Sequence, residues 1–207
     1  MHSGNILSLF EKLWKIGDLG LSQPINKTSQ NNEIYGVIPY IAPEIFNGAA
    51  FSKESDIYSM GMVMWELTTG CKPFADVEHG INLIYKIIDG ERPEITGDTP
   101  ECYASLMKEC WDADPLKRPS IEKICETMPY WKINYDIIGF RQAEKARKEL
   151  IQSKKLGPEF SEKPHLKAIF TSRMLNPFIS KSSSINSTSA FSSTTDQGIT
   201  IFKKLIL

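Results

Sequence analysis

The side chains of this sequence that most often bind metals or act as nucleophiles are its four cysteines and three histidines. No two cysteines form a C-x-x-C pair, and the histidines do not cluster with them. Structural zinc sites usually draw their ligands from such pairs. The spacing therefore argues against a zinc site and predicts reduced, mostly buried thiols, as in a cytosolic protein. The cysteines are Cys71, Cys102, Cys110 and Cys125.

Five short segments carry the remaining residues of chemical interest. Residues 16–20 read I-G-D-L-G, and a D-x-G turn of this kind is common in any loop, so it means little alone. Four further segments follow it along the chain, and a chance occurrence of all five together is negligible. They are A-P-E at 42–44, D-I-Y-S-M-G at 56–61 with W-E-L at 65–67, G-C-K-P-F at 70–74, and C-W-D-A-D-P-L-K-R-P at 110–119.

In this order and spacing, the five segments resemble the C-terminal lobe of a eukaryotic-type protein kinase domain, over about residues 2–128. The first is similar to the D-F-G element of that family, with Leu19 in place of Phe. The resemblance implies a mainly α fold, a helical kinase C-lobe with a short β-hairpin near the N-terminus. Nothing in the sequence resembles the kinase N-lobe, which we expect to be absent.

The resemblance also implies two metal- and cofactor-binding residues. In the family the Asp of D-F-G and the Asn that ends the catalytic loop H-R-D-x-x-x-x-N each hold a Mg²⁺ ion on ATP. These positions are Asp18 and Asn5, which lie 13 residues apart, the usual family interval. ATP and Mg²⁺ are thus expected in the intact domain. We do not expect this chain to bind them alone, because two ligands do not complete the octahedron of Mg²⁺ without substrate phosphates.

The catalytic Asp of the family would stand immediately before Met1, so no catalytic residue is assigned. The glycine-rich loop, the strand Lys and the helix Glu of the family have no counterpart either. We therefore expect a fragment of a kinase that transfers the ATP γ-phosphate to protein Ser/Thr, inactive alone. The alternative is a non-catalytic, pseudokinase-like interaction module. A start inside a catalytic loop favours the fragment, since no domain boundary respects such a loop.

Three positions bear on the kind of kinase. Tyr40 stands where serine/threonine kinases typically carry Tyr and tyrosine kinases usually carry Trp. Val37 departs from the family Thr, and His2 from the catalytic-loop Lys of serine/threonine kinases. The C-W pair at 110–111 is shared by tyrosine kinases and the tyrosine-kinase-like serine/threonine group. The resemblance is thus to that group, with serine/threonine specificity favoured over tyrosine.

The resemblance implies two internal contacts as well. The Glu of A-P-E pairs with the late Arg in the family, so Glu44 and Arg118 should form a buried ion pair. Asp56 should accept backbone N–H bonds from the catalytic loop. The alternative for Asp56 is an ordinary helix N-cap, for which Ser52 competes.

Hydrophobic periodicity places the elements around these motifs. Two apolar stretches within residues 6–21 fit a hairpin. A buried helix should begin at Ser52 and end at Gly70, with Leu67 among its apolar positions. Further helices are expected at 79–89, 100–111 and 119–127, and at 141–155, where the residues are strong helix formers.

The 207 residues carry a formal net charge of −1 and 41% hydrophobic residues, which is typical of a globular protein and gives no sign of nucleic-acid binding. We expect a C-lobe at 1–130, a partly helical extension at 131–170 and a Ser/Thr-rich, disordered tail at 171–207. No signal peptide or apolar run of about 20 residues is present, so we expect no membrane span and a cytoplasmic location. The expected partner is a protein substrate or signalling protein of unknown identity.

Overall fold

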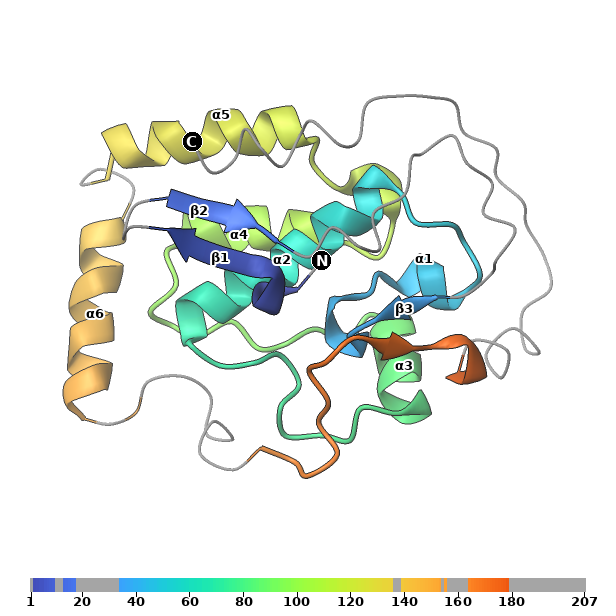
Figure 1. Ribbon diagram of the computed structural model, residues 1–207. Helices are drawn as coiled ribbons and strands as arrows, with labels where there is room; N and C mark the ends of the chain where they lie inside the picture. The colour runs from blue at the N-terminus through green and yellow to red at the C-terminus, as the bar shows by residue number, and fades with distance from the viewer. Residues whose placement is uncertain are drawn as a thin grey trace.

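The computed structural model describes most of the chain between residues 34 and 178, together with part of the N-terminal segment. The described residues are 2–9, 13–17, 34–135, 139–153, 155 and 164–178. They form a mainly helical structure with two small sheets (Figure 1). Among them, no helix combines the length and apolar character needed to cross a bilayer.

The predicted hairpin is present at the N-terminal end. A 3-10 turn, η1 (Ser3–Asn5), leads into β1 (Ile6–Leu9), which pairs antiparallel with β2 (Leu13–Ile16). The register sets Ile6 opposite Ile16. The end of η1 and the residue after β2 are therefore held at the same end of the hairpin.

The central helix α2 (Lys53–Thr69) begins and ends where the sequence predicts. The Ser52 hydroxyl accepts the Ser55 N–H, and the Ser55 side chain accepts the Ser52 N–H in return, which satisfies two groups of the first turn. Gly70 closes the helix with φ 71°, a conformation that glycine adopts without steric cost. Most of α2 is buried, as expected, but Leu67 is 62% exposed and does not belong to the apolar face predicted for it.

The other helices surround α2. The expected helices at 79–89, 100–111, 119–127 and 141–155 are found with slightly different ends, and α5 runs on past residue 127 through Pro129. Burial of Trp131 between Tyr103 and Phe140 accounts for this extension. The elements are η3 (Ile38–Tyr40), α1 (Pro43–Phe46), α3 (Ile81–Ile88), α4 (Glu101–Cys110), η4 (Pro115–Lys117), α5 (Ile121–Ile133) and α6 (Phe140–Gln152).

One hydrophobic core joins η3, α1, α2, α3 and α4. Its largest fully buried side chains, Tyr40, Phe46, Tyr58 and Trp65, are at most 1% exposed. The Trp65 indole N–H donates to the Glu94 carbonyl at 2.7 Å, so the polar atom of this ring is satisfied. The tryptophan and methionines of α2 thus serve core packing.

A segment near the end of the described chain returns to the lobe. Strand β4 (Arg173–Met174) pairs antiparallel with β3 (Tyr35–Gly36), and the two lie side by side in Figure 1 although they are far apart in sequence. Leu175, directly after β4, is fully buried. Composition assigned residues 171–178 to the disordered tail, whereas in the structure they pack against the lobe. The division of the chain into domains stays a prediction, and the tail beyond residue 178 lies outside the described residues.

Candidate active-site region

The turn η1 carries Asn5, the first of the two predicted metal-binding residues. The Asn5 side-chain oxygen accepts the His2 N–H at 3.3 Å, and the His2 ring nitrogen Nδ1 accepts the Gly4 N–H at 3.1 Å. These two bonds form a capping box that fixes the turn. An amide oxygen has two lone pairs and can accept more than one bond at a time.

The hairpin brings Asn5 to the chain segment of the second predicted ligand. The Gly17 N–H donates to the Asn5 carbonyl oxygen at 2.6 Å, continuing the pairing of β1 with β2. Gly17 immediately precedes Asp18 in the sequence. Asp18 itself lies outside the described residues, so the pairing of Asn5 with Asp18 stays a prediction.

A closed ring of contacts joins η1 to α2 and η3. The Lys72 ammonium donates to the Ser3 hydroxyl and to the Glu66 carboxylate, each at 2.6 Å. The Tyr40 hydroxyl donates to the other Glu66 oxygen at 2.6 Å. The Tyr40 ring faces the His2 ring, with centroids 6.0 Å apart. We call these five residues, His2, Ser3, Tyr40, Glu66 and Lys72, the polar ring.

Within the polar ring, the negative charge of Glu66 is compensated by the positive charge of Lys72. Glu66 is 15% exposed at its side chain and is neutralised by Lys72, which is 42% exposed. Burial raises the pKa of Tyr40 well above its usual value, and the charge and hydrogen bond of Glu66 raise it further, against a smaller opposing hydrogen bond from Ser3. Tyr40 therefore remains a neutral donor at physiological pH.

A buried ion pair ties the A-P-E segment to the late arginine, as predicted. Arg118 donates from Nη1 and Nη2 to the two Glu44 oxygens at 2.6 and 2.7 Å. The Arg118 side chain is fully buried, and its other bonds go to the Asp112 and Glu54 carbonyls, each at 2.9 Å. Such a bidentate pair, in which each of the three guanidinium nitrogens donates at least one hydrogen bond, fixes the position of both segments.

Tyr58 lies beneath this pair. The guanidinium groups of Arg118 and Arg92 approach its ring at 5.3 and 5.0 Å from the centroid, within cation–π range. Burial raises the pKa of Tyr58 to about 12, although both arginines act in the opposite direction. The cluster therefore joins α2 to the segments that flank α3 and α5.

Comparison with known proteins decides the family. Residues 1–128, more than half of the chain, match the family described as protein tyrosine and serine/threonine kinase. The chain belongs to the protein kinase family. The match confirms the resemblance to a kinase and the mainly α, C-lobe fold that it implied.

Individual relatives of this chain are protein kinases by name. It is 32% identical over 128 residues to a probable LIM domain-containing serine/threonine-protein kinase of Dictyostelium discoideum. The aligned residues make up 62% of this chain and 20% of that protein. It is 34% identical over 117 residues to human mitogen-activated protein kinase kinase kinase 7. This alignment makes up 56% of this chain and 19% of that protein. The chain thus spans a fifth or less of the length of these relatives.

The intact kinase domain uses ATP and Mg²⁺, and the donor atoms of this chain fit that ion in kind. The Asn5 amide oxygen is a hard ligand of the type that Mg²⁺ prefers. Among the described residues, no group of three or more His, Cys, Asp or Glu side chains is gathered where it could hold a metal. The remaining ligands of such a Mg²⁺ would therefore be Asp18, phosphate oxygens and water.

Asp56 does not cap α2, because Ser52 fills that position. The ordinary N-cap interpretation of Asp56 is therefore wrong. Burial raises the pKa of this carboxyl group above its usual range. Its predicted bonds to the catalytic loop of the kinase stay a prediction.

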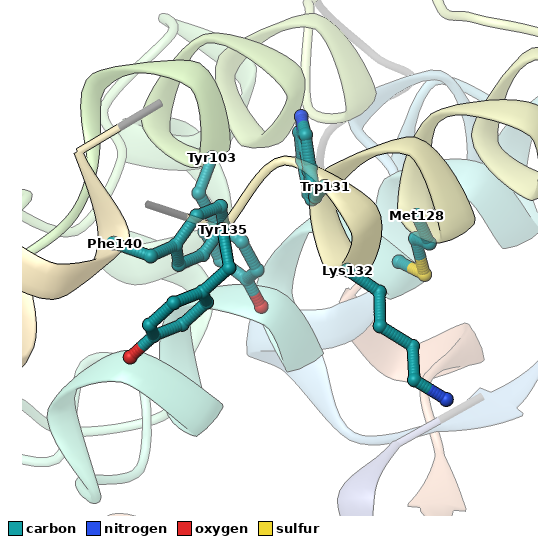
Figure 2. A pocket seen from close by; sticks show the side chains of 6 residues that line it. All are labelled: Tyr103, Met128, Trp131, Lys132, Tyr135 and Phe140. Atoms are coloured by element: carbon teal, nitrogen blue, oxygen red, sulfur yellow. The ribbon is translucent and has the colours of Figure 1, made fainter. Parts of the chain in front are cut away.

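Two cavities among the described residues are lined by no member of the polar ring. The first, of about 250 Å³, lies where α4, α5 and α6 meet, and Figure 2 shows the aromatic side chains gathered there with the Lys132 amine pointing away from them. The Tyr135 and Phe140 rings stack at 5.6 Å. This apolar lining is the packing that attaches α6 to the kinase lobe. The second cavity, of about 520 Å³, is lined by Gly97, Asp98, Ala146, Glu149, Leu150 and Ser153.

Three members of the polar ring, Ser3, Glu66 and Lys72, were not singled out from the sequence. Glu66 and Lys72 stand inside the kinase-like segments at 65–67 and 70–74, but their types alone indicate only a solvated acid and base. The signal that could have found them is their occurrence within motifs that otherwise consist of core and turn residues.

Proposed function

We propose that this chain is the C-terminal lobe of a cytoplasmic protein kinase that transfers the γ-phosphate of ATP to serine or threonine of a protein, in signal transduction. We also propose that these 207 residues alone do not transfer phosphate. The observation that supports the proposal is the polar ring, which connects the segment resembling the catalytic loop with the segment that leads into A-P-E. A kinase must hold these two segments together, because one serves the nucleotide and the other receives the protein substrate.

The polar ring makes this connection with charged and neutral hydrogen bonds. Lys72 holds Ser3, two residues before Asn5, while Glu66 holds Tyr40, four residues before Glu44. Since Lys72 and Glu66 also bind each other, displacement of either segment would break a bond of 2.6 Å. The ring therefore sets the position of Asn5 relative to the A-P-E segment.

In the proposed kinase, Asn5 and Asp18 would hold the Mg²⁺ of ATP. ATP with Mg²⁺ supplies the phosphoryl group and neutralises its charge. The part of this chain is to orient: the capping box fixes the Asn5 side chain, and the hairpin fixes Asn5 beside Gly17. The buried Glu44–Arg118 pair then holds the A-P-E segment in place.

The predicted inactivity follows from the number of catalytic and metal-binding residues that the sequence contains. The 207 residues contribute two of the expected metal ligands and no residue assigned as the base that takes the substrate proton. Loss of a general base alone costs about 10²–10⁴-fold in rate. Without further phosphate ligands, two oxygen donors do not hold Mg²⁺ and ATP in a reactive arrangement.

Serine/threonine specificity is the finer part of the proposal. Tyr40, the residue on which the sequence argument rests, is fixed by Glu66 and is 1% exposed. The Dictyostelium relative named above is a probable serine/threonine-protein kinase by name. Both observations favour a hydroxyl of serine or threonine as the acceptor.

The proposal is tested by phosphate transfer from labelled ATP to a mixture of Ser-, Thr- and Tyr-containing peptides. The chain alone should transfer nothing above background. A chimera that places the N-lobe and catalytic Asp of the human relative before Met1 should label Ser and Thr peptides. In the chimera, Asp18→Asn should abolish the transfer, whereas the control Asp89→Asn, at an exposed acid, should not.

Each outcome decides part of the proposal. Transfer by the chain alone that is lost in Asp18→Asn would overturn the predicted inactivity. Labelling of Tyr peptides only would overturn the specificity. A folded but inactive chimera would favour the non-catalytic interaction module instead.

A further inference from the structure

A buried carboxylate outside the polar ring lies in the loop between α3 and α4. The Asp98 side chain is 1% exposed, so its carboxyl group is almost completely withdrawn from solvent. Buried carboxylate oxygens normally meet a hydrogen-bond donor, because an unmet acceptor costs about 1–3 kcal/mol. The partners of Asp98 therefore show whether this group has all the contacts that it needs.

Among the residues that the structure describes, only one oxygen of Asp98 has a partner. Asp98 Oδ2 lies 3.5 Å from Arg147 Nη1, and the same nitrogen also donates to the Thr68 carbonyl near the end of α2. Asp98 Oδ1 is buried and meets no donor. The carboxylate is thus left with an unmet acceptor, which a ligand that carries N–H groups would satisfy.

A cavity of about 520 Å³ adjoins Asp98. It lies between the loop at 97–98 and a stripe of α6 that contains Ala146, Glu149, Leu150 and Ser153. These four residues share one face of the helix, because their spacings are three and four positions. The volume falls within the range of about 300–1,000 Å³ that is typical of pockets for small organic ligands.

The α6 side of the cavity combines oxygen atoms with an apolar surface. Glu149 contributes a second carboxylate. The Ser153 hydroxyl donates to the Glu149 and Leu150 carbonyls at 2.9 and 3.1 Å, so its oxygen can act as an acceptor toward a ligand. Ala146 and Leu150 contribute hydrocarbon to the same wall. A ligand with one polar end and an aliphatic body matches this lining.

The charges around the cavity favour a monovalent cation. The two carboxylates of Asp98 and Glu149 stand against the single guanidinium of Arg147, which leaves one negative charge to be balanced. Among the described residues, no group of three or more His, Cys, Asp or Glu side chains is gathered as a metal site would require. A primary ammonium group, by contrast, supplies one positive charge and three N–H donors.

We propose that the cavity between α6 and the loop at 97–98 binds a small organic monocation. Its primary ammonium group contacts the carboxylates of Asp98 and Glu149, and its aliphatic body packs against Ala146 and Leu150. Helix α6 lies beyond residues 1–128, which match the kinase family. The inference therefore goes beyond the proposed function and does not depend on phosphate transfer.

Entry of the ligand requires a small movement of α6. Asp98 Oδ1 is sealed from solvent, whereas α6 has no fully buried residue. Elements with few buried contacts open locally at a low cost in free energy. The bound ammonium group then bridges the loop and α6, so the ligand should also raise the melting temperature of the chain.

Isothermal titration calorimetry of the full chain with hexylammonium tests the proposal. We expect saturable binding with one site per chain. Asp98→Asn removes the charge and sets an amide beside the ammonium group, so it should weaken binding at least about tenfold. Glu149→Gln should weaken it to a smaller extent. The matched control is Glu144→Gln on the same helix, where an exposed acid pairs with Lys148, and it should bind as the wild type does.

Two further probes separate the contribution of the N–H donors from those of charge and hydrocarbon. Hexyltrimethylammonium keeps the charge and the hydrocarbon but has no N–H group, and hexanol keeps the hydrocarbon without the charge. Each should bind at least about tenfold more weakly than hexylammonium, because hydrogen bonds to charged groups are the stronger ones. Binding of either probe as tightly as hexylammonium would overturn the proposal.

A second variant keeps the test decisive if Asp98→Asn does not fold. Ala146→Phe fills the cavity and leaves both Asp98 and Arg147 in place, so it should abolish binding while circular dichroism shows an intact helical fold. Unchanged binding in this variant would contradict the proposed site. Absence of saturable binding to the wild type would show that water alone meets Asp98 Oδ1, and would also overturn the proposal. Since no ATP is present, an inactive chimera would leave this result unaffected.

Discussion

The Arg118 guanidinium donates two parallel hydrogen bonds, of 2.6 and 2.7 Å, to the Glu44 carboxylate across 74 positions of the chain. The arginine side chain is fully buried, and the glutamate is 17% exposed. This pair fixes the A-P-E segment to the turn that precedes α5. Removing one partner of this pair therefore tests how much the contact stabilises the lobe.

Replacement of Glu44 by Gln should destabilise the chain by about 3–5 kcal/mol, because the buried Arg118 charge would lose its partner. Urea unfolding followed by circular dichroism measures the change. The matched control is Glu109→Gln, which removes an exposed ion pair with Lys123 and should cost at most about 1 kcal/mol. Equal losses in both variants would show that the Glu44 pair has no special structural role.

The hydrogen bond from Tyr40 to Glu66 predicts a smaller effect. Tyr40→Phe leaves a Glu66 oxygen without its donor in a largely buried place and should cost about 1–3 kcal/mol. The comparable change at an exposed ring, Tyr130→Phe, should be near neutral. In the active chimera, Tyr40→Phe should also lower the rate of transfer, whereas a loss of stability alone would leave the rate of the folded fraction unchanged.

Local features of the fold could be predicted from the sequence, because their signals lie close together in the chain. Ser52 and Gly70 mark the ends of α2 through capping geometry that needs only neighbouring residues. The Glu44–Arg118 pair was predictable because both residues stand in recognisable motifs. By contrast, apolar periodicity placed Leu67 on a buried face, but its position near the end of α2 leaves it exposed.

Contacts between distant segments could not be predicted in the same way. Lys72 reaches Ser3 across 69 positions, and nothing in either local pattern indicates the partner. Strand β4, which pairs with β3, has only two residues and is too short for a strand pattern to be visible in the sequence. Asp18, which the sequence names as a ligand, lies outside the described residues and stays a prediction.

Close packing of α2 against α4 predicts an effect at Gly61. A Cβ atom there would lie 3.0 Å from the Cys110 Cβ and 3.3 Å from the Met107 carbonyl oxygen, neither of which can turn aside. The gain of about 1 kcal/mol in helix propensity should not offset the overpacking, which typically costs about 1–3 kcal/mol. Gly61→Ala should therefore lower the urea midpoint. The control Gly97→Ala meets no atom within 4 Å and should leave the midpoint unchanged or slightly raised.

The packing of residues 164–178 against the lobe should weaken at acidic pH through His79. The His79 Nε2 atom lies 3.0 Å from the Phe74 carbonyl oxygen, and Nδ1 lies 2.9 Å from the Ile169 carbonyl oxygen and 3.0 Å from the Ile169 nitrogen. A neutral ring that carries its proton on Nε2 can donate to Phe74 and accept the Ile169 N–H. Burial lowers the pKa of His79 below its ordinary 6.5, and the nearby charges of Arg173 and His165 lower it further, against the hydrogen bonds to the backbone.

Because the folded pKa lies below the unfolded one, the stabilising contribution of neutral His79 is complete above pH 6.5 and is lost as the pH falls through the folded pKa. The free energy of unfolding, measured by urea unfolding, should therefore fall as the pH is lowered from about 7.5 to 5.5. His79→Gln should flatten this change, whereas the control His165→Gln, at an exposed histidine, should largely preserve it. A pH dependence that persists unchanged in His79→Gln would assign the effect to another group.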